Sequence, residues 1–96
     1  MIETCEIHYT LDKTSMIYHT LQFWAEADGV GGRYRTAESR RFRGTLEAND
    51  AKATEEFRRL VARLKKEGWV ETGRGSEWFS YRFSREAKPA KNSGQG

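Results

Sequence analysis

The sequence predicts a small α+β domain in which four strands and one helix follow the order β-β-β-α-β, with a mostly antiparallel sheet and the helix packed on one face. Apolar and polar residues alternate along residues 3–11 and 16–27, which is typical of half-buried strands. Apolar residues recur at helical spacing between residues 50 and 67. Short connections join the first three strands, so these neighbours should run antiparallel.

The length of the chain limits it to one domain. Ninety-six residues can bury one hydrophobic core but not two. Hydrophobic residues make up 36% of the chain and aromatic residues 12%, so we expect large rings to form much of that core. We place the domain at residues 1–86. Residues 87–96 are polar and are expected to form a disordered tail.

The first expected strand covers residues 3–11. It directs Cys5 and Ile7 to one face, which we expect the helix to cover. Glu6 and His8 then point to the other face. Polar residues after this segment are compatible with a turn into the second strand.

The second expected strand covers residues 16–27. Leu21 and Phe23 point to the helix side, whereas Tyr18 and Trp24 point to the opposite face. A glycine-rich stretch at residues 28–32 follows and predicts a hairpin, because glycine tolerates positive φ.

The third expected strand covers residues 33–43 and ends at Gly44. Its alternation changes phase part of the way along, and a β-bulge near residues 38–40 would explain this change.

The helix is the clearest element of the sequence. Asn49 or Asp50 can cap its first turn through a side-chain oxygen. Gly68 suits the residue that follows the last turn. The apolar stripe consists of Ala53, Phe57, Leu60, Val61 and Leu64.

The last expected strand covers residues 77–84. Phe79 and Phe83 should face the helix, and Trp78 and Arg82 should face away from it. Since the helix crosses over the sheet, we expect this strand to lie parallel to the first strand and beside it.

Positive charge is concentrated in one short region. Residues 31–45 contain five arginines and one acid, although the whole chain has a net charge of only +3. Such a cluster can attract phosphate. Charged side chains also protect a sheet edge from unwanted pairing, and we favour this second explanation. The arginines are Arg33, Arg35, Arg40, Arg41 and Arg43.

The face of the sheet away from the helix is predicted to be rich in aromatic residues. Exposed patches of this kind often mark an interaction surface. A second copy of the chain, a protein partner or nucleic-acid bases could occupy it; alternatively, the rings could pack on one another and on arginine side chains. The candidate interaction surface consists of Tyr18, Trp24, Arg33, Arg35, Arg41, Trp78 and Arg82.

The sequence contains no pattern that predicts catalysis. His8 and His19 do not have the spacing of metal ligands, and no glycine-rich stretch matches a dinucleotide or phosphate-binding loop. We therefore expect no catalytic residue, no metal and no cofactor. Cys5 shares a face with Ile7 and should be a small buried residue.

The same residues suggest a cytoplasmic protein without a membrane segment. One cysteine cannot form an internal disulfide. No apolar run approaches the ~20 residues that a membrane-spanning helix needs. The N-terminus also lacks the basic and apolar regions of a signal peptide.

Seven short stretches of the sequence together form a pattern. They are CEI at residues 5–7, AES at 37–39, FR at 42–43, GW at 68–69, GRG at 73–75, WF at 78–79 and RF at 82–83. This pattern resembles a group of small bacterial proteins that have no known activity. Arg40 stands where that group often has proline, and Phe79 where it often has tyrosine. The resemblance supports the domain limits and implies no function.

A weaker resemblance links Trp24, Arg33, Arg35 and Arg41 to DNA-binding domains that combine a three-stranded sheet with one helix, in plant transcription factors and phage-type integrases. The expected fourth strand departs from that layout. The charge is also low for a protein that depends on many phosphate contacts. We therefore expect a non-enzymatic interaction module, either a homodimer or a partner-binding protein, with nucleic-acid binding as the alternative.

Overall fold

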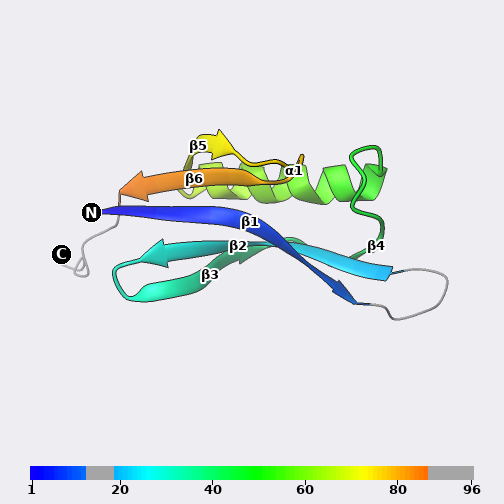
Figure 1. Cartoon of the computed structure of the whole chain (residues 1–96), viewed down its shortest axis with the longest axis horizontal. Helices are drawn as coiled ribbons and strands as arrows, with labels where there is room; N and C mark the ends of the chain where they lie inside the picture. The colour runs from blue at the N-terminus through cyan, green and yellow to red at the C-terminus, as the bar shows by residue number, and fades with distance from the viewer. Residues whose placement is uncertain (13–18, 87–96) are drawn as a thin grey trace.

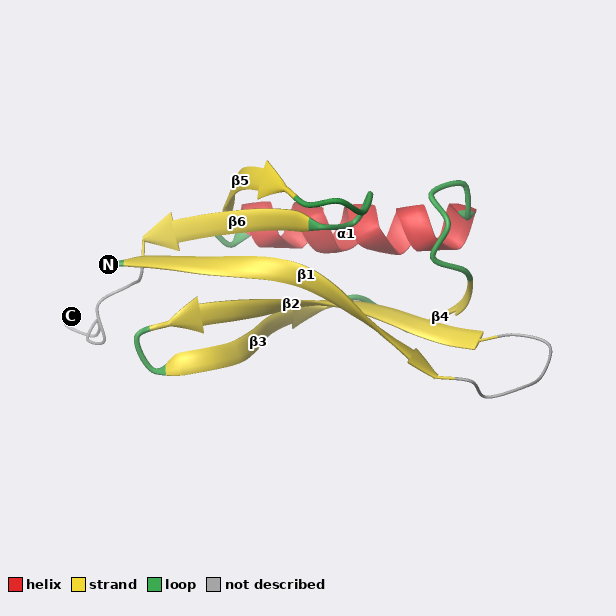
Figure 2. Cartoon of the chain, in the orientation of Figure 1, coloured by secondary structure: helices red, strands yellow, loops and turns green. Residues whose placement is uncertain are grey.

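The computed structural model describes residues 1–12 and 19–86 of the chain, so Tyr18 and the expected tail at residues 87–96 lie outside the described part. Six strands form one sheet, and one helix packs against it (Figure 1, Figure 2). The elements are β1 (Ile2–Asp12), β2 (His19–Gly29), β3 (Gly32–Glu38), β4 (Phe42–Gly44), α1 (Ala51–Lys66), β5 (Val70–Arg74) and β6 (Tyr81–Glu86). The α+β class is confirmed, whereas the expected count of four strands is wrong.

The order of the strands across the sheet is β3-β2-β1-β6-β5, and β4 also pairs with β2. Every pair of neighbours is antiparallel. The expected third strand is present as β3 and β4, which both lie along β2. They are separated at residues 39–41. Ser39 maintains the contact there, because its backbone N–H donates to the Phe23 carbonyl oxygen and its Oγ accepts from the Phe23 N–H. The sequence predicts a bulge near residues 38–40, but the β2–β3 register shifts earlier, between the pairs Ala25–Ala37 and Glu26–Arg35.

The position of the last strand differs from the prediction. β6 lies beside β1 as expected, but it runs antiparallel to it. The reason is β5, a strand that the sequence pattern does not predict. The chain leaves the helix, forms β5 at the outer edge and then returns as β6 between β5 and β1. The strand that directly follows the helix therefore runs in the same direction as β1 but does not touch it.

The helix begins and ends where the sequence predicts. The Asp50 side chain caps it, with Oδ1 accepting from the Ala53 N–H at 2.9 Å, and the following Gly68 has a φ of 96°. The expected stripe faces the sheet: Ala53, Leu60 and Leu64 are fully buried. Among the described residues, no helix is long and apolar enough to cross a membrane.

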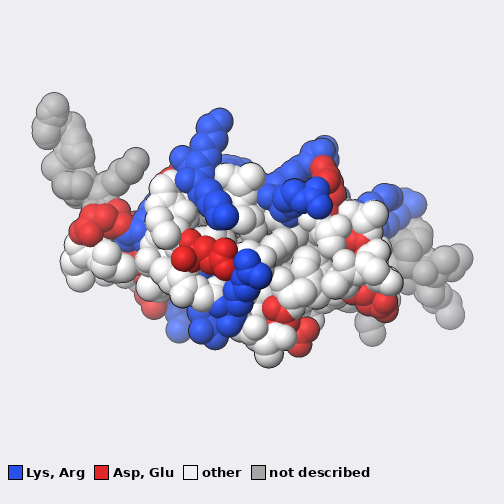
Figure 3. Space-filling model, turned by 90° about the horizontal axis from the view of Figure 1, so that it is seen from above, with Lys and Arg blue, Asp and Glu red and all other residues white. Residues whose placement is uncertain are grey.

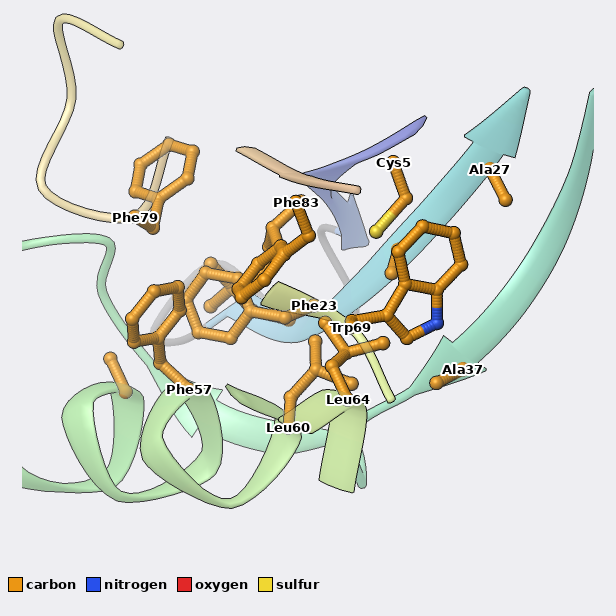
Figure 4. Packing of buried hydrophobic residues seen from close by; sticks show 14 of the residues in the cluster. Cys5, Phe23, Ala27, Ala37, Phe57, Leu60, Leu64, Trp69, Phe79 and Phe83 are labelled. Carbon is orange, nitrogen blue, oxygen red and sulfur yellow. The ribbon is translucent and has the colours of Figure 1, made fainter. Parts of the chain in front are cut away.

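The core lies between the helix and one face of the sheet, and aromatic rings fill its centre (Figure 4). Phe23 is inaccessible to solvent and lies among the rings of Phe42, Phe57 and Phe79 at centroid distances of 5.7–5.8 Å. Trp69, the largest fully buried side chain, closes the other end of the core near Leu64 (Figure 4). The alternation of β1 and β2 is confirmed for Cys5, Ile7, Leu21 and Phe23, which are all buried.

Candidate functional site

The open face of the sheet, which the helix does not cover, carries one large aromatic side chain among the described residues. Trp24 points to this face from the middle of β2 and is half-buried. Its indole N–H donates to Thr10 Oγ1 on β1 at 3.1 Å. The guanidinium of Arg35 on β3 lies 4.2 Å from the ring centroid, and the His8 ring on β1 lies 5.1 Å away. Three adjacent strands therefore hold the indole in place.

Charged side chains of both signs surround this tryptophan. Glu38 accepts a hydrogen bond from Arg35 at 2.8 Å. On the other side, His8 Nε2 lies 3.5 Å from a Glu26 carboxylate oxygen and 3.8 Å from one of Glu6. These pairs are exposed, so each stabilises the fold by about 0–1 kcal/mol at most. Their main effect is to fix the side chains around the indole.

Two acids face each other directly on this surface. Glu6 on β1 and Glu26 on β2 are cross-strand partners, an arrangement that is unfavourable for like charges. Arg82 on β6, 3.5 Å from Glu6, reduces this repulsion, and His8 lies between the two acids. A hollow of about 320 Å³ lies here, and Thr4, Asp28 and Arg33 also line it. The site is a shallow polar hollow beside an aromatic anchor.

The structure brings together only part of the predicted surface. Trp24 and Arg35 touch, Arg33 and Arg82 line the adjoining hollow, and Arg41 lies at the far end of the face, where it pairs with Asp12 at 2.9 Å.

Trp78 lies on the other side of the sheet, so its assignment to the open face is wrong. Its ring packs 5.2 Å from Phe57, and its N–H donates to the Leu46 carbonyl oxygen at 2.7 Å. The physical reason is that residues 75–80 form a loop before β6 begins at Tyr81, so strand alternation does not apply there. Consecutive rings at positions 78 and 79 can both enter the core.

Several contributors were not among the predicted site residues, and His8, Glu26 and Thr10 lie nearest to Trp24. The alternation of the first two strands places all three on the open face beside Trp24, and this signal could have identified them. What the sequence cannot give is the register, which brings His8 opposite Trp24 and Glu6 opposite Glu26.

Three side chains of the arginine-rich segment pair with acids. Arg40 pairs with Glu56 of the helix at 3.1 Å, and Arg35 and Arg41 have acidic partners of their own. A groove of about 700 Å³ separates residues 40–43 from the start of the helix, but Glu56 lines it together with the arginines.

Cys5 is buried in the core beside Ile7, as expected. Burial raises the pKa of its thiol to about 12, so the sulfur is protonated at neutral pH and is a poor nucleophile. Among residues 1–12 and 19–86, no group of three or more His, Cys, Asp or Glu side chains could hold a metal ion.

Neither the known protein families, nor the curated proteins, nor the solved structures include a significant match to this chain. The resemblance to small bacterial proteins therefore stays a prediction, and function has to be argued from the geometry alone.

Proposed function

We propose that this chain is a small non-enzymatic interaction module of the bacterial cytoplasm that binds a protein partner, or a second copy of itself, through the open face of its sheet. Trp24 is the observation that carries the proposal. Tryptophan and arginine dominate the binding energy of protein interfaces when polar neighbours exclude water around them. Here the indole is fixed by Thr10 and Arg35 and is ringed by charges.

The charge of this face favours a protein over a polyanion. Acids and arginines alternate across the strands: Glu26 is the cross-strand partner of Arg35, and Asp28 is that of Arg33. A protein surface can match such a mixed pattern, because charge complementarity between proteins uses both signs. A phosphate backbone would meet the acids as well as the arginines.

The test compares binding by the wild-type chain with two variants in cell extract from a bacterium that encodes it, followed by reconstitution with the purified partner. Trp24→Ala and Arg35→Glu should each abolish capture of the same protein. Arg59→Glu on the exposed side of the helix is the matched control and should leave capture unchanged. Circular dichroism of each variant checks the fold. Capture that is indifferent to both sheet variants would contradict the proposal.

Nucleic-acid binding is the second candidate function. The exposed basic residues of the helix favour α1, rather than the sheet, as the surface that would contact nucleic acid. All six basic residues of α1 are exposed. Figure 3, which views the molecule from above, shows Lys and Arg side chains in several groups, with Asp and Glu side chains between them. Glu55 and Glu67 pair with three of them, but Asp50 serves as the cap and Glu56 is buried. The basic residues are Lys52, Arg58, Arg59, Arg63, Lys65 and Lys66.

Fluorescence anisotropy with labelled DNA and RNA at two salt concentrations tests this candidate. Binding should weaken steeply with salt, because phosphate contacts release counterions. Arg59→Glu should weaken it further, and Arg33→Glu on the sheet should change it little. Absence of binding at low salt would exclude this candidate without affecting the first.

A further inference from the structure

In the described ranges of the chain, the second half of β1 forms a sheet edge that has no neighbouring strand on one side. β6 pairs with β1 only from Ile2 to Glu6, whereas β2 pairs with β1 as far as Asp12. Figure 1 shows that β6 flanks one half of β1 and that the other half has β2 alone as its neighbour. Within the described part of the chain, residues 7–12 therefore have no strand on their outer side. Alternate residues there direct backbone N–H and C=O groups to that side, as an edge strand does.

This edge differs from the other edges of the sheet. β3 carries Arg33 and Arg35 and has a register shift opposite residues 25 and 26. β5 has a register shift between Glu71 and Gly73, followed by Arg74. Charged side chains and bulges are the devices by which proteins prevent edge-to-edge pairing.

The open half of β1 has none of these devices until its last residue. Its sequence is Ile-His-Tyr-Thr-Leu-Asp, which contains no lysine, arginine, proline or glycine. It is also regular, since its pairing with β2 continues through residues 7–12 without a shift. Tyr9 and Leu11 are 43% and 37% exposed, although they point to the same face as the buried Ile7. An unprotected, regular and partly apolar edge is suited to strand addition.

We propose that this edge pairs with the same edge of a second copy, so that one antiparallel sheet runs through both protomers. The sequence is self-complementary about Thr10. With Thr10 opposite its own copy, Tyr9 lies opposite Leu11 of the second copy, and His8 lies opposite Asp12 of the second copy. Because directly opposed residues share a face, the apolar pairs extend the helix side and the polar pairs extend the open face.

A pocket lies beside the start of the open half of β1. Where β6 leaves β1, a pocket of about 290 Å³ separates β1 from the loop that precedes β6. Ile7, His8 and Tyr9 line one wall, and Phe79 and Ser80 line the other. Phe79 already packs against Tyr9, with centroids 5.5 Å apart. Leu11 of the second copy would reach Tyr9 at the mouth of this pocket and extend that apolar contact.

The first measurement is sedimentation of the full chain from low to high micromolar concentration. The wild type should form a dimer. Leu11→Lys should weaken the dimer by roughly tenfold or more, since the two-fold symmetry removes two apolar cross-strand pairs and places a charge at each. Val30→Lys is the matched control, because Val30 is an exposed residue of the β2–β3 turn, far from this edge. This control should dimerise like the wild type.

Cysteine cross-linking tests the register. Thr10→Cys should form a disulfide-linked dimer on mild oxidation, because the two Cβ atoms would lie within about 4.5–5.5 Å. Asp12→Cys should not, because its partner is His8 of the second copy. Cys5 is buried and does not compete. A monomer at all concentrations would overturn the inference, and so would cross-linking at Asp12→Cys but not at Thr10→Cys.

The edge and the open face can be told apart by the same experiment. A dimer that is lost in Leu11→Lys and kept in Trp24→Ala supports pairing at the edge, and leaves the open face to another partner. A dimer that is lost in Trp24→Ala and kept in Leu11→Lys overturns the edge inference while supporting the proposed function.

Discussion

Phe23 and Trp24 are neighbours on β2, and the difference between them is the difference between the two faces of the sheet. The Phe23 ring has only other side chains around it and is fully buried, with Phe57 and Trp78 in edge-to-face contact. The Trp24 ring is half-exposed and is held by a hydrogen bond to Thr10 and by Arg35.

An aromatic side chain can therefore be held in one position without a helix or sheet packed over it. On the covered face, ring packing removes apolar area from water and stabilises the fold. On the open face, a cation above the ring and a hydrogen bond hold the indole, which stays partly exposed. We therefore expect the first residue to matter for stability and the second for binding.

The largest expected effect is a loss of stability when a residue on the covered face is truncated. Phe23→Ala should lower the free energy of unfolding by about 3–5 kcal/mol, because it leaves a cavity at the centre of the core. Trp24→Ala should cost about 1 kcal/mol, the scale of an exposed cation–π contact. Urea unfolding of both variants measures the difference. Equal losses would mean that the two faces contribute alike.

The second prediction compares two arginines of β6 on opposite faces. Arg85 is 19% exposed; it stacks 4.3 Å from the Trp69 ring, donates to the Glu67 carbonyl oxygen and pairs with the buried Glu3. Arg85→Ala should cost about 1–3 kcal/mol, because it leaves a buried carboxylate short of a partner. Arg82→Ala on the open face should cost under about 1 kcal/mol. Thermal unfolding in the same buffer measures the stability that each variant loses. A larger loss for Arg82→Ala than for Arg85→Ala would contradict the prediction.

The third prediction concerns the cap of the helix that covers the core. Hydrogen bonds from the Ala53 N–H and from Thr45 lower the pKa of Asp50. Asp50→Ala should cost about 1 kcal/mol near neutral pH. Because the folded-state pKa is lowered, this contribution is present above about pH 4 and is lost as the pH falls further. Urea midpoints of wild type and variant should therefore converge at low pH. A gap that persists there would show that the cap does not act through its charge.

The smallest effect is one of reactivity rather than stability. Cys5 should not react with a thiol reagent at pH 8 in the native protein, because burial raises its pKa to about 12. Thr4→Cys, the adjacent position on the open face, should react at the rate of an ordinary exposed thiol. In the unfolded protein, the two thiols should react with the reagent at similar rates. Because the folded pKa is raised, this group stabilises the fold below about pH 8.5, and that contribution declines as the pH rises toward 12. Rapid native reaction of Cys5 would contradict its burial.

Local patterns in the sequence predicted the helix and the faces of β1 and β2 correctly. Asp50 and Gly68 bound the helix through caps that act within a few residues. Leu21 and Phe23 are buried because strand alternation fixes their side. The same rule failed at Trp78, since residues 75–80 are not a strand. It also missed β5, because the short segment Val70–Arg74 has three polar residues and a glycine and lacks the pattern of a buried strand.

The sequence by itself determined which residues could be buried together, because helical and strand periods are properties of neighbouring residues. The tertiary structure decided the rest. Register places His8 and Arg35 against Trp24, long-range pairing inserts β6 beside β1, and the early departure of β6 leaves residues 7–12 open. These are contacts between distant segments, and their geometry depends on how the whole core packs.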